Sequence, residues 1–361
     1  MTPRMNVQIG CDNLAKERNY WLDNTKALLI LLVVLGHAAD YYTSVSDDMK
    51  VFFFFVYLFH MPLFIFLSGL FSKSIINGKR LKLEKIVSYL ILFVSLNVLI
   101  FSIRHFVMGQ DNSFSLFSVD GVPWYMFAMA AWLGLTYLLK EIKPQVLFVL
   151  SILLALYVGY EDRVADLFVA SRIIVFYPMF LLGYFLPVEK VMKLKQYKAL
   201  VPAAAFVLVS IFLAVYFRID DFYPLRPFLS GRNSYETAGQ ETLGGLIRFV
   251  WYGATFVISI AILVLMPMKK FSWSIIGMRT LQIYFLHRPL LYLFHHFGVD
   301  QTFEAVFGGL WAEAYMLFFL LVGIALAWKP LEWPFKKVMG LKLDQIYRKS
   351  ETIRSPQSKA V

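Results

Sequence analysis

Cysteine is almost absent from this sequence, and charged residues are scarce. The single cysteine, Cys11, excludes an intrachain disulfide and a zinc site built from cysteine ligands. Only 16% of the residues are charged, whereas 59% are hydrophobic and 17% are aromatic. This balance departs from that of a soluble domain and is typical of a protein that crosses the membrane several times.

Several motifs of well-known enzyme classes are missing as well. The sequence has no glycine-rich phosphate loop, no dinucleotide fingerprint, no His-Glu-x-x-His metal pair and no Gly-x-Ser-x-Gly serine elbow. The first twenty residues lack the basic, apolar and small-residue order of a signal peptide, so we expect no cleaved leader. No motif or charge pattern repeats between the two halves, which argues against an inverted-repeat transporter.

The sequence does contain a series of long apolar segments, each near the ~20 residues that a bilayer needs. We expect an all-α polytopic membrane protein with an N-terminal segment (1–20), a membrane domain (21–330) and a basic C-terminal tail (331–361). The ten predicted segments, of which the fifth and sixth are short, are approximately 22–41, 51–71, 84–103, 122–139, 145–160, 171–186, 199–217, 247–267, 274–294 and 306–328.

Basic residues follow the loops of this ten-segment arrangement. With a cytoplasmic N-terminus, 24 of the 35 Lys and Arg residues fall on inner loops and termini, while the outer loop 40–50 is acidic. This distribution satisfies the positive-inside rule and puts both termini in the cytoplasm. Topology therefore explains most of the net charge of +11, in preference to nucleic-acid binding. One predicted cytoplasmic loop holds a dense run of basic residues, Lys79, Arg80, Lys82 and Lys85, which is suited to binding a phosphate-rich ligand.

The first apolar segment carries ionisable residues along one face. At about 100° per residue, Lys26 and His37 lie about 20° apart around the helix axis, with Asp23 and Asp40 near the same stripe. At ~1.5 Å rise per residue, Lys26 and His37 are roughly 16 Å apart along the axis. Such a stripe usually faces protein or a water-filled cavity, and Asp23 can pair with Lys26. His37 is either a base or nucleophile, or a hydrogen-bonding link between helices.

Polar residues in the second and fourth segments mark further candidates. His60 precedes Pro62, so it either satisfies the carbonyl that this proline leaves free or is a second group in the same cavity. Ser68-Gly69 allows close helix approach. Trp124 and Tyr125 suit an aromatic belt at the membrane interface, and the same pair can stack on a sugar ring.

Two later segments carry cations and a histidine. Arg172 precedes Tyr177-Pro178 and Gly183, and it either snorkels to the interface or lines a cavity. His287 and Arg288 lie inside an apolar run, where they are costly unless a partner neutralises them or function uses them. The histidines have no spacing that supports a metal site, so we expect none.

Together these residues resemble the acyltransferase-3 family of membrane enzymes, especially its fucose 4-O-acetylase-like branch, over roughly residues 18–330. The family pattern is a basic residue, commonly arginine, followed by ten others and then histidine, and Lys26 with His37 fits it. The family's Arg-x-x-Arg pair is Lys82-Leu83-Glu84-Lys85 here. The similar motifs are Tyr20-Trp21-Leu22-Asp23-Asn24-Thr25-Lys26 with Leu35-Gly36-His37, Phe59-His60-Met61-Pro62-Leu63-Phe64 with Ser68-Gly69, Pro123-Trp124-Tyr125, Tyr177-Pro178 with Gly183, and Thr280-Leu281-Gln282-Ile283-Tyr284 with His287.

The resemblance implies an O-acetyltransferase of a bacterial plasma membrane that moves an acetyl group from cytoplasmic acetyl-CoA to a hydroxyl of an extracytoplasmic glycan or lipid-linked sugar. His37 then acts as general base or carries the acyl group. The alternatives are a transporter or flippase for a lipid-linked sugar, whose charges line a path, and a glycan polymerase. We assign the catalytic group to His37, Lys26, Asp23 and His60, the CoA phosphates to Lys79, Arg80, Lys82 and Lys85, and the substrate site to Trp124, Tyr125, Arg172, His287 and Arg288.

Overall fold

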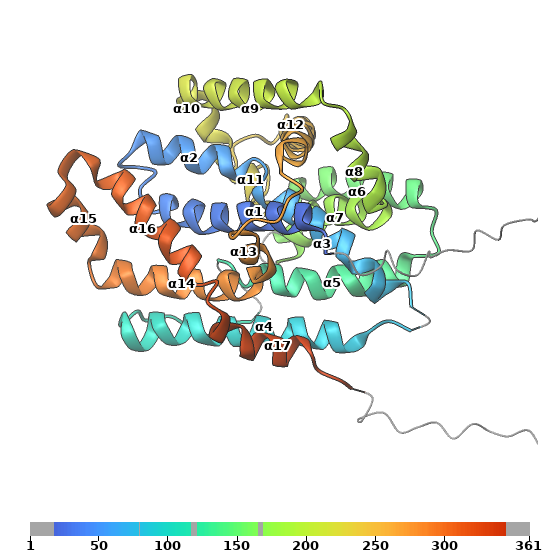
Figure 1. The fold of residues 1–361 in the computed structure, drawn as a ribbon, viewed down its shortest axis with the longest axis horizontal. Helices are drawn as coiled ribbons and strands as arrows, with labels where there is room; N and C mark the ends of the chain where they lie inside the picture. The colour runs from blue at the N-terminus through green and yellow to red at the C-terminus, as the bar shows by residue number, and fades with distance from the viewer. Residues whose placement is uncertain (1–17, 79, 117–120, 165–168, 344–361) are drawn as a thin grey trace, which may run out of the picture.

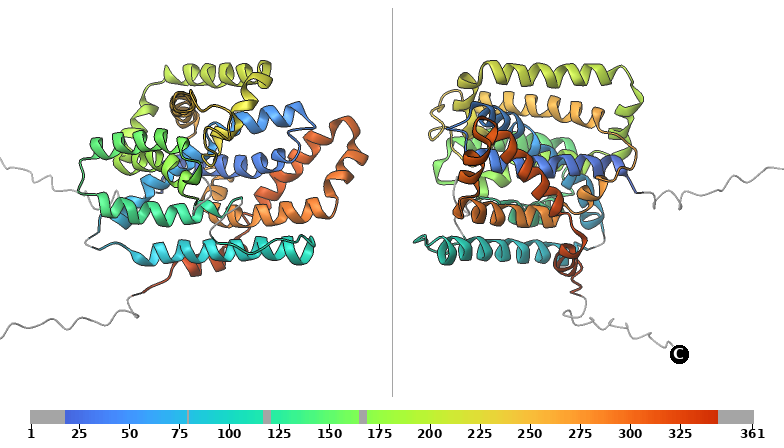
Figure 2. Two further views of the ribbon diagram at one scale, coloured as in Figure 1. Left: turned by 180° about the vertical axis from the view of Figure 1, so that it is seen from behind. Right: turned by 60° about the vertical axis from the view of Figure 1, so that its left-hand side comes forward.

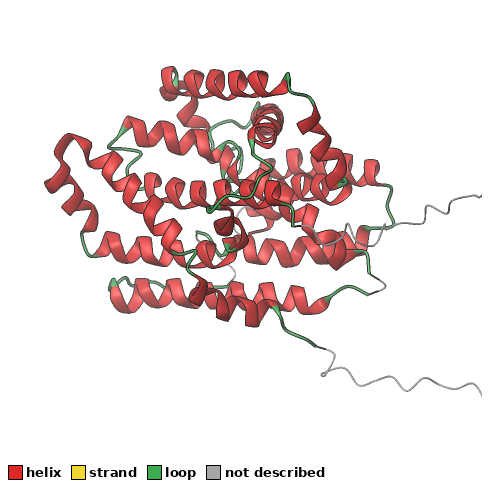
Figure 3. Cartoon of the chain, in the orientation of Figure 1, coloured by secondary structure: helices red, strands yellow, loops and turns green. Residues whose placement is uncertain are grey.

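The computed structural model describes residues 18–78, 80–116, 121–164 and 169–343 (Figure 1). Within these residues every regular element is helical and none is a strand (Figure 3), which confirms the predicted all-α class. Polar side chains mark helix starts: Asn19 Oδ1 accepts from the Leu22 amide and Ser46 Oγ from the Met49 amide, each at 3.3 Å. Cys11, Lys79, most of segment 1–20 and the tail beyond residue 343 lie outside the described residues.

The helices follow one another with short connections. The main ones are α1 (Tyr20–Asp40), α2 (Asp47–Tyr57), α3 (His60–Ile76), α4 (Leu83–Ser102) with the π-helical turn η2 (Ile103–Val107), α5 (Trp124–Leu139), α6 (Pro144–Tyr157), α7 (Ala170–Phe185), α9 (Leu200–Phe217), α12 (Gly244–Leu265), α14 (Thr280–His296), α15 (Val299–Phe307) and α16 (Trp311–Ala325). The short ones are α8 (Val188–Met192), α10 (Ile219–Phe222), α11 (Arg226–Leu229), α13 (Ser274–Met278) and α17 (Trp333–Met339).

Six helical stretches among the described residues are long and apolar enough to cross a membrane. A seventh candidate is α7 joined to Val188–Gln196, with a bend of 91° between them. The protein is therefore a multi-pass membrane protein, whereas ten crossings and cytoplasmic termini stay predictions. Several predicted segments form helices shorter than 18 residues, such as α5 with 16 residues and α14 with 17.

The predicted segment 51–71 is broken into α2 and α3 just before His60. Pro62 has no amide hydrogen to donate to the carbonyl of Leu58, and the hydroxyl of Thr255 donates to that carbonyl at 2.6 Å. The Nδ1 of His60 instead contacts the carbonyl of Val56 at 2.9 Å. Thr255 thus takes the structural role that the sequence left open for His60.

The first helix, α1, lies at the centre of the bundle, while α9 and α4 lie at opposite edges in all views (Figures 1 and 2). Helix α1 packs against α2, α3, α13, α14 and α16. Most of its residues are buried, whereas α9 buries only Ala204 and Val215. The ionisable stripe of α1 therefore faces protein, as its cost in lipid requires.

Helices α3 and α7 approach each other at two glycines. A Cβ on Gly69 would lie 2.1 Å from the carbonyl oxygen of Phe180, and one on Gly183 would lie 1.9 Å from that of Phe66. Both distances are far below van der Waals contact, so only glycine fits at either position. The predicted role of Ser68-Gly69 in close helix approach is confirmed, and the contact joins the helix of His60 to that of Arg172.

Candidate active site

A cavity of about 800 Å³ lies where α1 ends, bordered by α2, α3, α7 and α14 and by the loop that follows α11. Helix α1 supplies His37 to it, near the end of the buried stripe. The histidines, arginines and acidic residues of the described lining are His37, His60, His295, Arg104, Arg172, Arg226, Arg232, Arg288 and one carboxylate, Asp40. The cavity therefore brings together His37, His60, Trp124, Arg172 and Arg288, which the sequence analysis singled out separately.

The imidazole of His37 has one nitrogen that accepts hydrogen bonds. The Nη1 of Arg288 lies 3.4 Å from Nδ1, and the hydroxyl of Tyr57 lies 3.1 Å from it. A guanidinium can only donate, so Nδ1 presents its lone pair and the proton of the neutral ring is on Nε2. The contact with Arg288 is longer than a good hydrogen bond, and the hydroxyl of Tyr57 can rotate its hydrogen away, so this lone pair is available to a closer donor.

The two described histidines that are fully buried, His60 and His287, have the opposite tautomer. The Nδ1 of His287 lies 2.8 Å from the carbonyl of Tyr284 and 3.1 Å from that of Ile283, and His60 Nδ1 contacts the Val56 carbonyl. Carbonyl oxygens only accept, so both rings donate from Nδ1. The ring of His287 stacks on that of His37 with centroids 5.3 Å apart, and it thereby fixes one face of the candidate base.

The two predicted arginines, Arg288 and Arg172, each contact aromatic rings. The guanidinium of Arg288 is 5.2 Å from the ring centroid of Tyr41 and 4.9 Å from that of Tyr292, besides its contact with His37. Arg172 lies 5.2 Å from the Trp124 ring, and its Nη1 donates to the carbonyl of Gly121 at 3.4 Å. Aromatic rings hold both cations in place, and Arg288 is the one at the candidate base.

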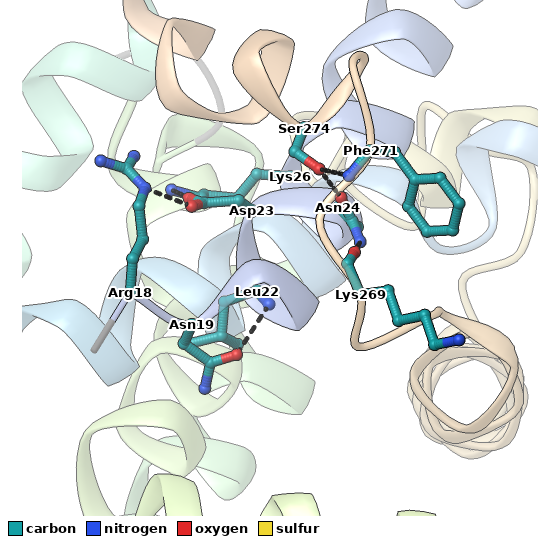
Figure 4. A network of polar contacts seen from close by, with 9 residues as sticks. All are labelled: Arg18, Asn19, Leu22, Asp23, Asn24, Lys26, Lys269, Phe271 and Ser274. Atoms are coloured by element: carbon teal, nitrogen blue, oxygen red, sulfur yellow. Dashed lines mark hydrogen bonds and ion pairs between the residues drawn. The ribbon is translucent and has the colours of Figure 1, made fainter. Parts of the chain in front are cut away.

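The opposite end of the stripe forms a polar network (Figure 4). The carboxylate of Asp23 pairs with Lys26 Nζ at 2.9 Å and with Arg18 Nε at 2.7 Å, which confirms the predicted Asp23–Lys26 pair. The amide of Asn24 donates to two backbone carbonyls of the segment 267–269 at 2.9 Å each, and its oxygen accepts from Ser274 Oγ at 2.6 Å. These bonds fix this end of α1 to the connection between α12 and α13.

Lys26 borders a second cavity of about 270 Å³. Tyr284 borders both cavities, and Tyr125 borders only the second one. The ring centroids of these two tyrosines are 5.3 Å apart, and the hydroxyl of Tyr125 lies 2.5 Å from Ser68 Oγ. Trp124 and its neighbour Tyr125 thus face different cavities, with the tyrosine rings between them.

The predicted phosphate-binding run is only partly a free surface. Arg80 and Lys82 are exposed, whereas the ammonium of Lys85 donates to the backbone carbonyl of Met339. Ser88 also donates to this helix, at 2.7 Å from the Val338 carbonyl. The structure therefore docks α17, the start of the predicted tail, against the run and ties Lys85 to it.

The segment that follows α1 contacts α15 through Tyr42. The hydroxyl of Tyr42 donates to Asp300, whose carboxylate also lies 3.1 Å from Nδ1 of His295. Burial and the bond to Asp300 raise the pKa of Tyr42, so the phenol keeps its proton. Asp300 thus links Tyr42 to His295, which lines the first cavity.

Sequence reasoning missed Tyr57 and the arginines at 104, 226 and 232. Tyr57 lies one turn before His60, which was a signal that it shares the same helix face. The arginines were counted only as residues outside the predicted inner loops. The high density of arginine outside the predicted inner loops runs against the positive-inside rule, and it was a second signal that these residues belong to the site.

In comparisons with known proteins, one family model matches residues 19–328, and its description is an acyltransferase domain. No curated protein and no solved structure matches the chain. Among the described residues, no group of three histidine, cysteine or acidic side chains is arranged to hold a metal ion.

Proposed function

Since the chain belongs to the acyltransferase-3 family, we propose that it is a membrane O-acetyltransferase that uses acetyl-CoA to acylate a hydroxyl of a glycan or lipid-linked sugar. The motifs favour the fucose 4-O-acetylase-like branch, and the loop charges favour ten crossings of a bacterial plasma membrane with both termini inside. In this orientation the Lys26 end of the bundle is cytoplasmic and the His37 cavity is on the acceptor side.

The observation that carries the proposal is the lone pair of His37 Nδ1 in a cavity, 3.4 Å from a guanidinium. A neutral imidazole that presents a lone pair can take a proton from a hydroxyl, and a cation beside it can stabilise an oxyanion. We assign the base role to His37 in preference to an acyl-histidine.

The proposed reaction is a direct transfer. The acceptor hydroxyl gives its proton to His37 Nδ1 while its oxygen bonds to the thioester carbonyl carbon, and Arg288 Nη1 stabilises the oxyanion that forms. The carbon–sulfur bond then breaks, and the leaving thiolate of CoA takes the proton from Nδ1. The products are the acetyl ester and free CoA, with His37 neutral again.

The donor enters from the Lys26 end under this proposal. Lys26, oriented by Asp23, provides positive charge along the donor path, and the exposed Arg80 and Lys82 meet the CoA phosphates together with Lys79 and Lys85. His60 lies in the wall of the acceptor cavity, in ring contact with Tyr57 at 4.6 Å, and it supports the partner of His37.

The test is acetyl transfer from labelled acetyl-CoA to an envelope glycan extract in membranes. Replacing His37 by alanine removes the base, and we expect turnover to fall by roughly 10²–10⁴-fold. His296→Ala is the matched control, because His296 is exposed and does not line the cavity. Near-normal turnover of His37→Ala at normal protein levels would contradict the proposed role.

The purified protein separates this function from a transporter or flippase. Acyl transfer needs only the protein, the acyl donor and an acceptor, so ester formation in detergent requires no second compartment. A transporter produces no ester under these conditions. Absence of both CoA release and ester with an active preparation would therefore favour the transport class.

A further inference from the structure

A third cavity, of about 230 Å³, lies between α3, α7, α8 and α12 and shares no lining residue with the two cavities described above. The side chains that line it are apolar except for those of Lys190, Thr255 and Ser259. The hydroxyl of Thr255 already donates to the carbonyl of Leu58 at 2.6 Å. A polar ligand would lose its bonds to water here and find few replacements, so the cavity is suited to an aliphatic chain.

The depth of this cavity corresponds to one leaflet of a bilayer. Its lining follows α12, one of the candidate membrane spans, from Thr255 near the middle of the helix to Leu263 near its end. At ~1.5 Å per residue this is about 12 Å, against about 15 Å for half of a ~30 Å hydrocarbon core. Phe256 lines the cavity and is exposed, so the cavity opens to the surface of the bundle, where lipid chains lie.

One end of the cavity is bordered by the bent segment Val188–Gln196, which follows α7 at an angle of 91°. The ammonium of Lys195 donates to the carbonyl of Val264, and the amide of Asn19 lies 3.3 Å from the sulfur of Met192. These contacts fix the bent segment at the Lys26 end of the bundle. When α7 crosses the bilayer, a segment at a right angle to it runs along the membrane surface.

The bent segment has an apolar side and a basic side. Val191 and Leu194 line the cavity, whereas Lys190 and Lys193 are exposed and lie three residues apart, on neighbouring turns. Lys190 also lines the cavity, so an exposed cation borders an apolar space. The segment contains three lysines against one acidic residue, Glu189. The combination of an apolar slot and a cationic rim complements a molecule with an aliphatic chain and an anionic head.

We propose that this cavity binds an anionic glycerophospholipid of the surrounding bilayer. One acyl chain lies between α3, α7 and α12, and the phosphate of the head group meets the ammonium groups of Lys190 and Lys193. Lysine can lay its aliphatic stem along the lipid while its charge stays at the head-group level, and basic groups at the surface attract anionic lipids. This site is independent of the proposed acyl transfer.

The experiment measures thermal unfolding of the purified full-length protein in a neutral detergent. Phosphatidylglycerol is added in one series and phosphatidylcholine with the same acyl chains in another. A ligand that binds only the folded protein raises Tm as its concentration increases. We expect this rise with phosphatidylglycerol at concentrations where phosphatidylcholine has little effect. Equal rises with both lipids would indicate unselective lipid contact, and no rise with either would indicate no site, so both results would overturn the inference.

A third series distinguishes the lipid from its head group alone. Glycerol phosphate carries the anionic charge but has no chain to enter the cavity, so it should leave Tm unchanged. If it stabilised the protein as well as phosphatidylglycerol does, the ligand would be a free phosphate and the inference would be overturned.

Variants of the basic rim test the contact with the head group. The double variant Lys190→Gln/Lys193→Gln should raise the apparent Kd for phosphatidylglycerol by roughly 10-fold or more, because each cation at the surface contributes about five-fold. Lys269→Gln/Lys270→Gln is the matched control, since both lysines are exposed, lie at the same end of the bundle and do not line the cavity. Equal losses of affinity in the two double variants would overturn the local assignment.

A variant that fills the cavity tests the position of the chain. Ser259→Phe introduces a ring among the lining residues and should abolish the preference for phosphatidylglycerol while both lysines remain. Val257→Phe is the control, because Val257 is exposed on the same helix and does not line the cavity. Equal affinities of these two variants would overturn the inference. The lysine variants change only exposed side chains, so they keep the site testable if Ser259→Phe does not fold.

Discussion

Replacing Gly183 by alanine should separate α3 from α7. The new Cβ would lie 1.9 Å from the carbonyl oxygen of Phe66, whereas a carbon and a carbonyl oxygen approach to about 3.3 Å, so the backbones must part by about 1.4 Å. This oxygen belongs to the backbone, so a change of side-chain rotamer cannot move it away. We therefore expect the cost of overpacking, about 1–3 kcal/mol or more, to exceed the ~1 kcal/mol that alanine gains in helix propensity.

Gly253→Ala is the matched control for this variant. Gly253 also lies inside a long helix, α12, but a Cβ there would meet no heavy atom within 4 Å. It should therefore keep or raise stability through helix propensity alone. The measurement is thermal unfolding of both variants in the same detergent, followed through loss of monomer. For a chain of 361 residues, a loss of about 2 kcal/mol lowers Tm by roughly 3 °C.

The outcome bears on the site as well as on stability. Helix α3 carries His60 and α7 carries Arg172, so the variant should also lose acetyl transfer at temperatures where it remains folded. If Gly183→Ala unfolded at the same temperature as Gly253→Ala, the close approach of the two helices would be refuted.

Two further predictions concern the Lys26 end. Charge reversal of the exposed Arg80 and Lys82 to glutamate should raise the KM for acetyl-CoA, because the new carboxylates would repel its phosphates. The same reversal at exposed Lys143 should leave this KM unchanged. Equal effects at all three positions would argue against a local docking site. Asp23→Asn should lower the free energy of unfolding by roughly 2–3 kcal/mol. This is less than the about 3–5 kcal/mol lost when a fully buried ion pair is broken, because Lys26 keeps some access to water. Adding Lys26→Gln should restore part of that loss, as measured by thermal unfolding, and a double variant less stable than Asp23→Asn would exclude this pairing.

Much of the fold class and the centre of the site could be predicted from the sequence. The apolar runs required helices, and the 3.6-residue period put Asp23 beside Lys26 and His37 on the same stripe. The cost of burial singled out Arg172, His287 and Arg288 as members of a site. These inferences depend on local spacing or on composition, which a single sequence contains.

The remaining features depend on contacts between distant segments. Which hydroxyl satisfies the carbonyl freed by Pro62 depends on α12, which supplies Thr255 from almost two hundred residues away. Trp124 and Tyr125 were expected to act together, yet neighbours on a helix point about 100° apart, so they border different cavities. The number of crossings also stays a prediction, because helix length rather than apolar composition limits several segments.

The tyrosine rings between the two cavities bear on how tightly the membrane is sealed. The hydroxyl of Tyr284 donates to the carbonyl of Val122, and that of Tyr125 is bonded to Ser68, so both rings are fixed at their ends. A continuous cationic passage between the cavities would let small anions leak down their gradient. Under the proposed acyl transfer, only the slender thioester arm of the donor would need to pass these rings. The proposed reaction would then leave the permeability barrier of the bilayer intact.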